Sequence, residues 1–377
     1  MKQNFLLIWI VFVVFSCHSI QNENETRRRS PSVSKLEDTI KFPVKQKFVE
    51  YSYFETDSNE WLSYLSSGYI YILDLGNKKI VDSIDVSLDS IAAKKYGEIS
   101  SFCFSGRDSL FVLFNEAVVF WVDKKVNKII PINELDSAQY TTFRFQDLED
   151  VPIYYDRTAQ AVVGEVYCSD CWQTEPAFYS QSIIGSISIH SGRIKLFDIS
   201  YPKKYLKNYY GFDMKPYAET DDSITLVAYP CGDMVSILNR NSNTASSFPA
   251  RSIFQTEDAQ PLTPLSDSGS VEQKMRHMAV QPYYSEIRFD RARQLYYRFF
   301  RKAIPLKNKD GTYNNFFNKG LVLMVLNSQH DVIGEYELPK YYNSYVSFVG
   351  KSGLYIYDVS PNPEYKNLTV FHVLTFK

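Results

Sequence analysis

Residues 69–81, Tyr-Ile-Tyr-Ile-Leu-Asp-Leu-Gly-Asn-Lys-Lys-Ile-Val, indicate the fold of this 377-residue chain. An apolar run is followed by a polar turn around Gly76 and then by a second apolar segment. Tyr, Ile and Val favour strands because their bulky side chains pack well on a pleated surface. A short polar turn between two such runs is typical of a β-hairpin. The stretch therefore predicts two adjacent antiparallel strands.

The same pattern of strand, polar turn and strand recurs along the chain. Its further copies lie at residues 118–130, 187–197, 235–245 and 322–333, and a last strand pair covers 353–357 and 368–374. The turn residues, which are Asp74, Asp123, His190, Asn239 and Asn327, are 49, 67, 49 and 88 residues apart. A period of about 45–50 residues with insertions is typical of a four-stranded propeller blade.

Five copies and the C-terminal pair predict an all-β, six-bladed β-propeller of the TolB-like or NHL-like kind. The first two strands of a blade are expected in segments such as 100–104 with 109–114, and insertions near 168–180 and 254–281. The early strand 47–54 is expected to pair with the last blade and close the ring, which removes exposed sheet edges. A seven-bladed ring or a pair of β-sandwiches is the structural alternative.

The N-terminus has the features of a lipoprotein signal peptide. Lys2 precedes an apolar run over residues 5–15, which is too short to span a bilayer. The following Val-Phe-Ser-Cys resembles a bacterial lipobox, in which Cys17 is lipidated, with palmitate among the acyl chains, and becomes the first mature residue. The alternative is a core cysteine in an ordinary secretory signal.

These features predict three parts of the chain: a signal peptide at 1–16, a lipidated cysteine with a polar, flexible tether at 17–42, and the propeller at 43–377. On this interpretation the protein is exported to the cell envelope. A lipid anchor holds it to a membrane, for which we expect the outer membrane. Whether it faces the periplasm or the cell surface stays open.

Composition limits the classes of partner. The formal net charge is −2, so the chain lacks the basic excess typical of proteins that bind nucleic acid. No phosphate-binding loop, nucleophile elbow or His-Glu-x-x-His motif occurs, so we expect neither a cofactor nor a metal site.

An exported chain meets an oxidising compartment, which permits disulfides. Cys168 and Cys171 form a C-x-x-C pair in a loop-like segment. Three interpretations stay open for this pair. It forms a local disulfide or stays as free loop thiols, one of its members bonds to Cys231, or it serves a redox or metal function.

The densest charge cluster lies at residues 288–302. Arginine forks bind carboxylates well and aromatic rings stack on sugars. Arg288, Tyr297 and Arg298 are therefore the candidate ligand-binding residues at the mouth of the channel. The alternative is that these residues form structural pairs and solvated turns.

A second recurring feature is the triplet of Asp, Ser or Thr, and an apolar residue. It resembles an O-glycosylation sequon of exported Bacteroidota proteins, although Asp and Ser are also common in turns that precede strands. The candidate glycosylation sites are Thr39, Ser83, Ser90, Ser109, Ser137 and Ser223.

The chain resembles an uncharacterised family of Bacteroidota lipoproteins. The resemblance rests on the lipobox, the repeat at residues 71–81, the segments 283–290 and 295–298, and residues 350–356. That family is described only as a domain of unknown function. The resemblance covers most of residues 45–377 and implies a six-bladed propeller-like core, but no catalytic residues.

The sequence thus predicts a lipid-anchored propeller that binds a protein or glycan partner without catalysing a reaction. The alternative is a propeller enzyme, a lyase or hydrolase that acts on glycans in the central channel. Propellers host both kinds of function, so the fold alone does not decide between them.

Overall fold

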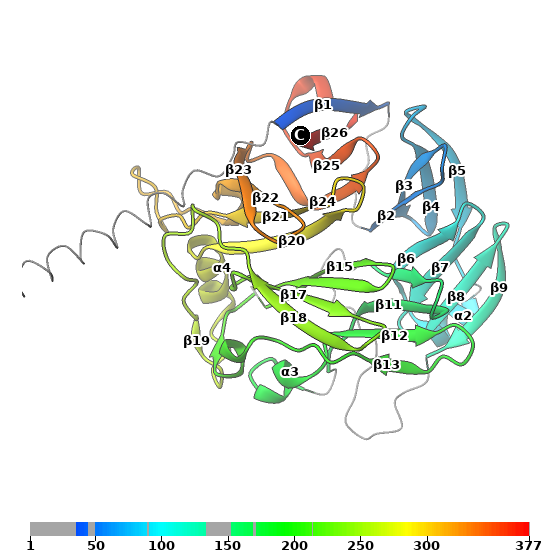
Figure 1. Ribbon diagram of the computed structural model, residues 1–377, viewed down its shortest axis with the longest axis horizontal. Coiled ribbons are helices and arrows are strands. Elements are labelled where there is room, and N and C mark those ends of the chain that lie inside the picture. Colours follow the sequence, from blue (N-terminus) through cyan, green and yellow to red (C-terminus); the bar gives the residue numbers. More distant parts are fainter. Residues whose placement is uncertain are drawn as a thin grey trace, which may run out of the picture.

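The chain folds into a ring of small antiparallel sheets in the computed structural model (Figure 1). The structure describes residues 35–43, 50–88, 90–132, 152–168, 171–212 and 214–376. Within these ranges, six four-stranded sheets are arranged as the blades of a β-propeller, which confirms the predicted fold class.

The first three blades, each given from its inner to its outer strand, follow one another along the chain. Blade 1 contains β2 (Tyr51–Glu55), β3 (Glu60–Ser66), β4 (Tyr69–Asp74) and β5 (Lys79–Asp85). Blade 2 contains β6 (Ile99–Gly106), β7 (Ser109–Phe114), β8 (Ala117–Val122) and β9 (Lys125–Pro131). Blade 3 contains β10 (Tyr154–Asp156), β11 (Ala161–Glu165), β12 (Ile184–Ser188) and β13 (Ile194–Leu196).

The last three blades complete the ring. Blade 4 contains β15 (Tyr217–Asp221), β16 (Ile224–Ala228), β17 (Met234–Asn239) and β18 (Thr244–Pro249). Blade 5 contains β20 (Tyr283–Asp290), β21 (Leu295–Arg301), β22 (Leu321–Leu326) and β23 (Val332–Leu338). Blade 6 contains β24 (Tyr342–Gly350), β25 (Gly353–Asp358), β26 (Thr369–Phe376) and, as its outer strand, β1 (Lys35–Phe42).

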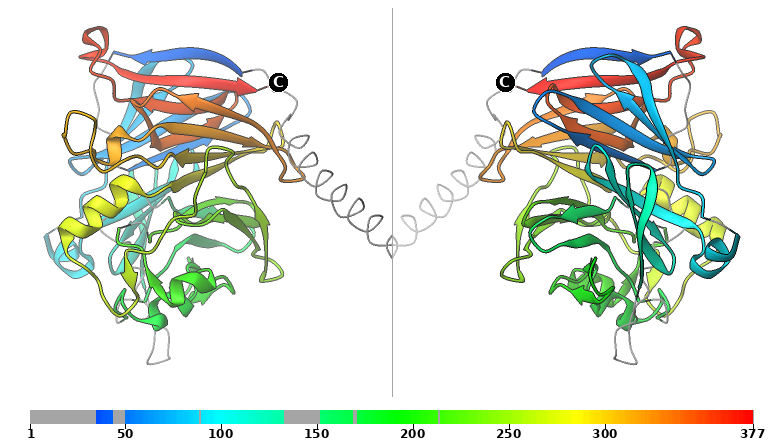
Figure 2. Two further views of the ribbon diagram at one scale, coloured as in Figure 1. Left: turned by 90° about the vertical axis from the view of Figure 1, so that its left-hand side faces the viewer. Right: turned by 90° about the vertical axis from the view of Figure 1, so that its right-hand side faces the viewer.

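Short helices and one small ribbon lie in the connections. They are α2 (Ser90–Tyr96), α3 (Pro176–Ser180), η1 (Lys203–Leu206), α4 (Val271–Val280), η2 (Phe316–Asn318), η3 (Pro363–Tyr365) and the pair β14 (Asn208–Tyr209) with β19 (Thr263–Pro264). The predicted insertions near 168–180 and 254–281 contain α3 and α4. Figure 2 shows α4 on the side of the molecule opposite to the C-terminus.

In blades 1–5 the repeated sequence unit corresponds to the third and fourth strands. Residues 69–81 form β4 and the start of β5, and the later copies match the outer strands of blades 2–5 in the same way. The polar turn residue has a structural role, because the Asp74 carboxylate accepts the backbone N–H of Asn77 at 2.7 Å. The Asn239 side chain likewise accepts the N–H groups of Asn241 and Ser242. Such side-chain bonds stabilise tight turns.

The core is divided among the interfaces between blades. Each pair of neighbouring blades buries a separate cluster of apolar side chains within the described part of the ring. Between blades 1 and 2, for example, Trp61 packs in the same cluster as Phe102 and Leu110. The aromatic excess of the sequence is thus used to fill the wedge-shaped spaces between twisted sheets.

The closure of the ring differs from the expectation. The predicted closing strand, residues 47–54, overlaps β2, which is the innermost strand of blade 1. The ring is instead closed by β1, which pairs with β26 from Lys35↔Phe376 to Phe42↔Thr369. The boundary between tether and propeller at residue 42 is therefore wrong for residues 35–42. This strand has a polar sequence because its outer position leaves most of its side chains at least partly exposed.

Candidate functional site

The innermost strands of the six blades surround a cavity of about 160 Å³ at the centre of the ring. Each inner strand, or the residues directly before it, contributes to the wall. The lining residues are Glu50, Tyr51, Ser52, Tyr53, Ser101, Pro152, Ile153, Tyr154, Glu219, Thr220, Arg288, Ser347, Phe348 and Val349. This central cavity is the candidate functional site.

A partly buried ion pair crosses the wall of the central cavity. Arg288 of β20 lies 3.2 Å from the carboxylate of Glu219 on β15, and its side chain is 7% exposed. Burial raises the pKa of Glu219, and the neighbouring Arg288 opposes this shift. The pair joins blades 4 and 5 at the axis of the ring.

The remaining donors of Arg288 are also engaged. Its Nε donates to the carbonyl of Ser347 at 2.7 Å, and its Nη2 donates to the hydroxyl of Tyr51 at 3.2 Å. That hydroxyl also accepts the backbone N–H of Ser347 at 3.1 Å. Arg288 and Tyr51 therefore hold the inner strands of blades 1, 5 and 6 together, and each guanidinium nitrogen donates to a group of the protein.

Glu50 differs from the other charged groups of the wall. Among the described residues its carboxyl has neither an ion pair nor a hydrogen bond, although its Oε2 atom is buried. Burial raises the pKa of this carboxyl to about 7. A carboxylate taken out of water without a partner is costly, so proton uptake near neutral pH follows from its position.

Aromatic rings at the starts of β15 and β20 pack against an inserted segment. Tyr217 and Tyr283 pack edge to face, and Phe316 of η2 packs in the same way on Tyr283. Lys319, which is fully buried, donates from Nζ to the carbonyl of Met278 at 2.9 Å and so joins the segment after η2 to α4.

The same region contains a second buried carboxyl. Glu286 of β20 is 3% exposed, and neither of its carboxylate oxygens has a hydrogen-bond partner within the described ranges. It lies at a β-bulge, where the pairing of β20 with β21 shifts between Tyr284 and Ile287. A bulge of this kind redirects a side chain locally.

Of the three ligand-binding candidates, only Arg288 lines the central cavity. Tyr297 is fully buried, and its hydroxyl donates to the Asp290 carboxylate at 2.9 Å. Arg298 is also fully buried, and its guanidinium donates to the carbonyls of Gly232, Asp233 and Ala250. Their position on the second strand of blade 5, rather than the innermost one, places these two residues away from the channel wall.

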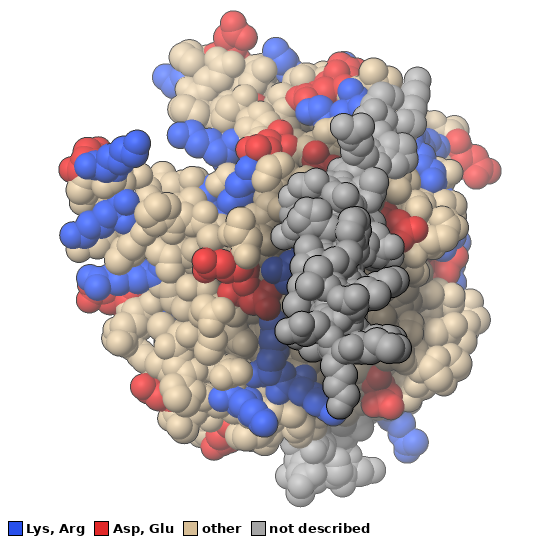
Figure 3. All heavy atoms as spheres, turned by 60° about the vertical axis from the view of Figure 1, so that its left-hand side comes forward, with Lys and Arg blue, Asp and Glu red and all other residues tan. Residues whose placement is uncertain are grey.

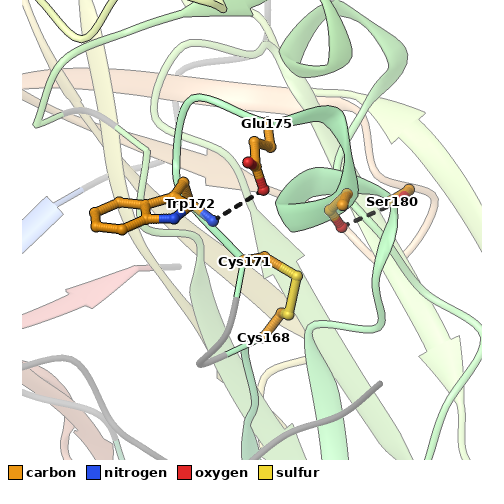
Figure 4. Close-up of a disulfide and its surroundings, with 6 residues drawn as sticks. Cys168, Cys171, Trp172, Glu175 and Ser180 are labelled. Carbon is orange, nitrogen blue, oxygen red and sulfur yellow. Dashed lines mark hydrogen bonds between the residues drawn. A yellow bond between two sulfur atoms is a disulfide. The ribbon is translucent and has the colours of Figure 1, made fainter. Parts of the chain in front are cut away.

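The cysteines lie apart from the central cavity. Cys168 and Cys171 form a disulfide at the start of the insertion that contains α3 (Figure 4). Directly after it, Trp172 is 74% exposed, and its backbone N–H donates to Glu175 at 3.3 Å. Cys231 is buried in the cluster between blades 3 and 4 and does not take part in this disulfide.

The glycosylation candidates are scattered over the blades. Ser83 in β5 is exposed, while Thr39 in β1, Ser109 at the start of β7 and Ser223 in the turn after β15 are half-buried. Ser90 is the first residue of α2. Ser137 and the lipidation candidate Cys17 lie outside the described residues.

The sequence pointed to Arg288 but not to Glu50 or Glu219. These residues come from separate inner strands that are far apart in the chain, so no local motif connects them. A weak signal was available for β20 alone, because charged residues in an otherwise apolar strand indicate a buried polar role.

The described residues contain no group of three or more His, Cys, Asp or Glu side chains that could hold a metal ion. Within the same ranges, no helix is long and apolar enough to cross a membrane. On the face drawn in Figure 3, basic and acidic side chains are scattered among other residues.

The sequence profile of a domain of unknown function, DUF4221, matches residues 32–337. A solved structure of a DUF4221 family member from Bacteroides vulgatus is similar, with a TM-score of 0.75, 18% identity, and coverage of 93% of this chain and 99% of that one. At this identity the likeness shows the fold.

Two further solved structures align at lower similarity. Hydrazine synthase of Kuenenia stuttgartiensis aligns with a TM-score of 0.43 and 10% identity, covering 83% of this chain and 75% of that chain. The β-propeller domain of Cps50 (Swd1) from Myceliophteria thermophila aligns with a TM-score of 0.43 and 9% identity, covering 89% and 99%. Among curated proteins, none matches the sequence.

Proposed function

This chain belongs to the DUF4221 family, and we propose that its propeller is a binding module that receives one group of a protein or glycan partner in the central cavity. The observation that supports this proposal is the convergence of all six inner strands on one cavity that is lined by charged groups. Its volume of about 160 Å³ suits a single side chain or sugar ring, because a cavity of about 150 Å³ can hold benzene.

The hydrogen bonds among the residues of the cavity wall favour binding over catalysis. Arg288, Glu219 and Tyr51 bond to one another or to the backbone, so they are held in place rather than presented as a free acid and base. Glu50 is the one carboxyl of the described wall for which no partner is found. Cleavage of a glycan requires a second group to act with such an acid, and this enzymatic activity is the alternative.

The proposal is tested by a thermal-shift screen of the full chain in mild detergent against peptides, neutral sugars, amino sugars and uronic acids. A ligand that binds only the folded state raises the melting temperature, by a few degrees at a hundredfold excess over its Kd. We expect Ser52→Leu, which adds volume at the cavity wall, to abolish the shift, whereas Ser52→Ala retains it.

The matched control is Ser328→Leu, which adds the same side chain at an exposed turn and should leave the shift unchanged. The proposal fails if no compound raises the melting temperature, or if Ser52→Leu folds and binds as well as the wild type. Release of a cleaved product from any sugar in the same samples would favour the enzymatic alternative.

We also infer that the module is exported and lipid-anchored through Cys17, at the outer membrane of the cell envelope. The inference rests on the apolar run at residues 5–15 and on the lipobox-like Val-Phe-Ser-Cys. We expect labelled palmitate to be incorporated into the wild-type protein in cells and not into Cys17→Ala. Equal labelling of Cys17→Ala and the wild type would contradict the anchor.

A further inference from the structure

We propose that the central cavity binds a primary ammonium group on an apolar stem, the chemistry of a lysine side chain presented by a protein partner. This inference rests on the proposed binding function and specifies its ligand. It is carried by the charge balance of the wall, by the Glu50 carboxyl, for which the described residues provide no partner, and by the apolar and aromatic surfaces that surround it.

The first step of the argument is the charge balance. The described lining contains two carboxyl groups, Glu50 and Glu219, and a single cation, Arg288. Arg288 pairs with Glu219 at 3.2 Å, so their charges compensate each other. When Glu50 is ionised, the wall therefore carries one net negative charge, which attracts a cation and repels an acidic ligand.

The second step concerns the group that lacks a partner. No hydrogen bond or ion pair is found for the Glu50 carboxyl within the described ranges, and its Oε2 is buried. Burial also raises the pKa of the Glu50 carboxyl to about 7. A buried charge is retained at low cost only when an opposite charge and hydrogen bonds accompany it. An ammonium group supplies both, because it carries one charge and three donors.

The third step concerns the rest of the ligand. Tyr53 and Phe348 stack at a centroid distance of 5.2 Å, and Ile153 and Val349 add apolar surface to the wall. Aromatic faces attract cations, and apolar walls accept the methylene chain that carries an ammonium group.

Two hydroxyl groups of the wall already donate to backbone carbonyls. The Tyr51 hydroxyl donates to the carbonyl of Ser347 at 2.8 Å, and the Ser347 hydroxyl donates to the carbonyl of Ser344 at 2.7 Å. A sugar ring needs several hydrogen-bond partners for its hydroxyl groups, whereas a lysine side chain needs them only at its end. The wall therefore suits a lysine side chain better than a sugar.

The assignment changes the role expected for Arg288. An arginine in a ligand site commonly binds a carboxylate through its fork of donors. Here Nε donates to Ser347, Nη1 pairs with Glu219 and Nη2 donates to Tyr51. The guanidinium thus orders the wall, and an acidic glycan would have to displace these bonds.

The test is calorimetric titration of the full chain in mild detergent with Nα-acetyl-lysine methylamide, whose side-chain ammonium group is free. Nα-acetyl-norleucine methylamide is the uncharged analogue. At pH 8 we expect the lysine compound to bind at least tenfold more tightly than the norleucine compound. Between pH 8 and pH 6 its affinity should fall about tenfold, because Glu50 takes up a proton while the ligand amine stays charged.

The other titratable groups of the described wall are Glu219, Tyr51, Tyr53, Tyr154 and Arg288. Glu50→Gln separates their contribution from that of Glu50. This variant keeps the side-chain shape, so we expect it to fold, to lose at least tenfold in affinity at pH 8, and to lose the pH dependence. Glu116→Gln, at an exposed turn, removes an equal charge and should bind as the wild type does.

The outcomes separate this inference from the proposed function. Equal binding of the norleucine compound, unchanged binding by Glu50→Gln, or no binding of the lysine compound at all would overturn the ammonium assignment. If a neutral or acidic sugar binds instead and Ser52→Leu abolishes it, the binding function stands with a different ligand. Stronger binding of an amino sugar than of the lysine compound would show that the ammonium group belongs to a glycan partner and not to a protein.

Discussion

A chain that begins at residue 35 should unfold at the temperature of the full-length protein, whereas one that begins at residue 43 should lose most of its stability. The second truncation removes β1, which pairs along its whole length with β26. It also removes Phe42, which is fully buried and packs edge to face on Phe371 at 6.4 Å. We expect a loss of roughly 5 kcal/mol or more, comparable with the net stability of a typical domain.

The comparison is made by thermal and urea denaturation of the full-length protein and the two truncated proteins. A permuted chain provides the control, because Lys35 lies opposite Phe376 in the antiparallel pair. Residues 35–42 joined after Lys377 through a short turn should therefore pair with β26 and restore stability to the chain that begins at residue 43. Equal stability of the two truncated chains would show that β1 is not needed to close the ring.

This closure illustrates what the sequence could predict. The outer strands of blades 1–5 were predictable because each repeats an apolar run and a polar turn, such as the one at Asp74. The closing strand was not, because β1 has only one fully buried side chain, Phe42, and otherwise resembles a polar linker. Unlike the outer strands of blades 1–5, β1 is not joined by a short turn to the strand it pairs with, because β26 lies at the other end of the chain.

The central cavity was predictable in position but not in its residues. A propeller has a channel at its axis, so the fold itself places the site. Its groups, however, are Glu50, Glu219 and Arg288, and these meet only because three different inner strands converge. The charge cluster at residues 288–302 contained one of them, and register along β20 and β21 decided which arginine reached the cavity.

Replacement of Arg298 should destabilise the protein strongly, although this arginine does not line the central cavity. Its guanidinium lies 3.9 Å from the ring centre of Tyr284 and donates to the carbonyls of Gly232, Asp233 and Ala250 at 2.6–2.8 Å. Burial lowers its pKa to about 10, so it stays charged at neutral pH. These bonds join β21 of blade 5 to two connections of blade 4.

Arg298→Met removes the donors and leaves the carbonyls of Gly232 and Ala250 without this partner, whereas the Asp233 carbonyl still accepts the backbone N–H of Ala250. The cost is about 1–3 kcal/mol for each group that stays unsatisfied. We expect a total loss of about 3–5 kcal/mol in urea denaturation at pH 7. Arg298→Lys keeps the charge and some donors, so its loss of stability should be smaller than that of Arg298→Met. Some loss remains because lysine has no planar fork. Arg251→Met, at an exposed arginine with its own ion pairs, should cost less than about 1 kcal/mol.

The same variants distinguish a structural arginine from one that binds the ligand. If Arg298 only joins blades 4 and 5, Arg298→Lys should bind the lysine compound with unchanged affinity wherever it remains folded. A variant that keeps wild-type stability but loses binding would instead show that Arg298 contributes to the ligand site. The buried carbonyl contacts favour the first outcome, because they use the guanidinium donors that a ligand would need.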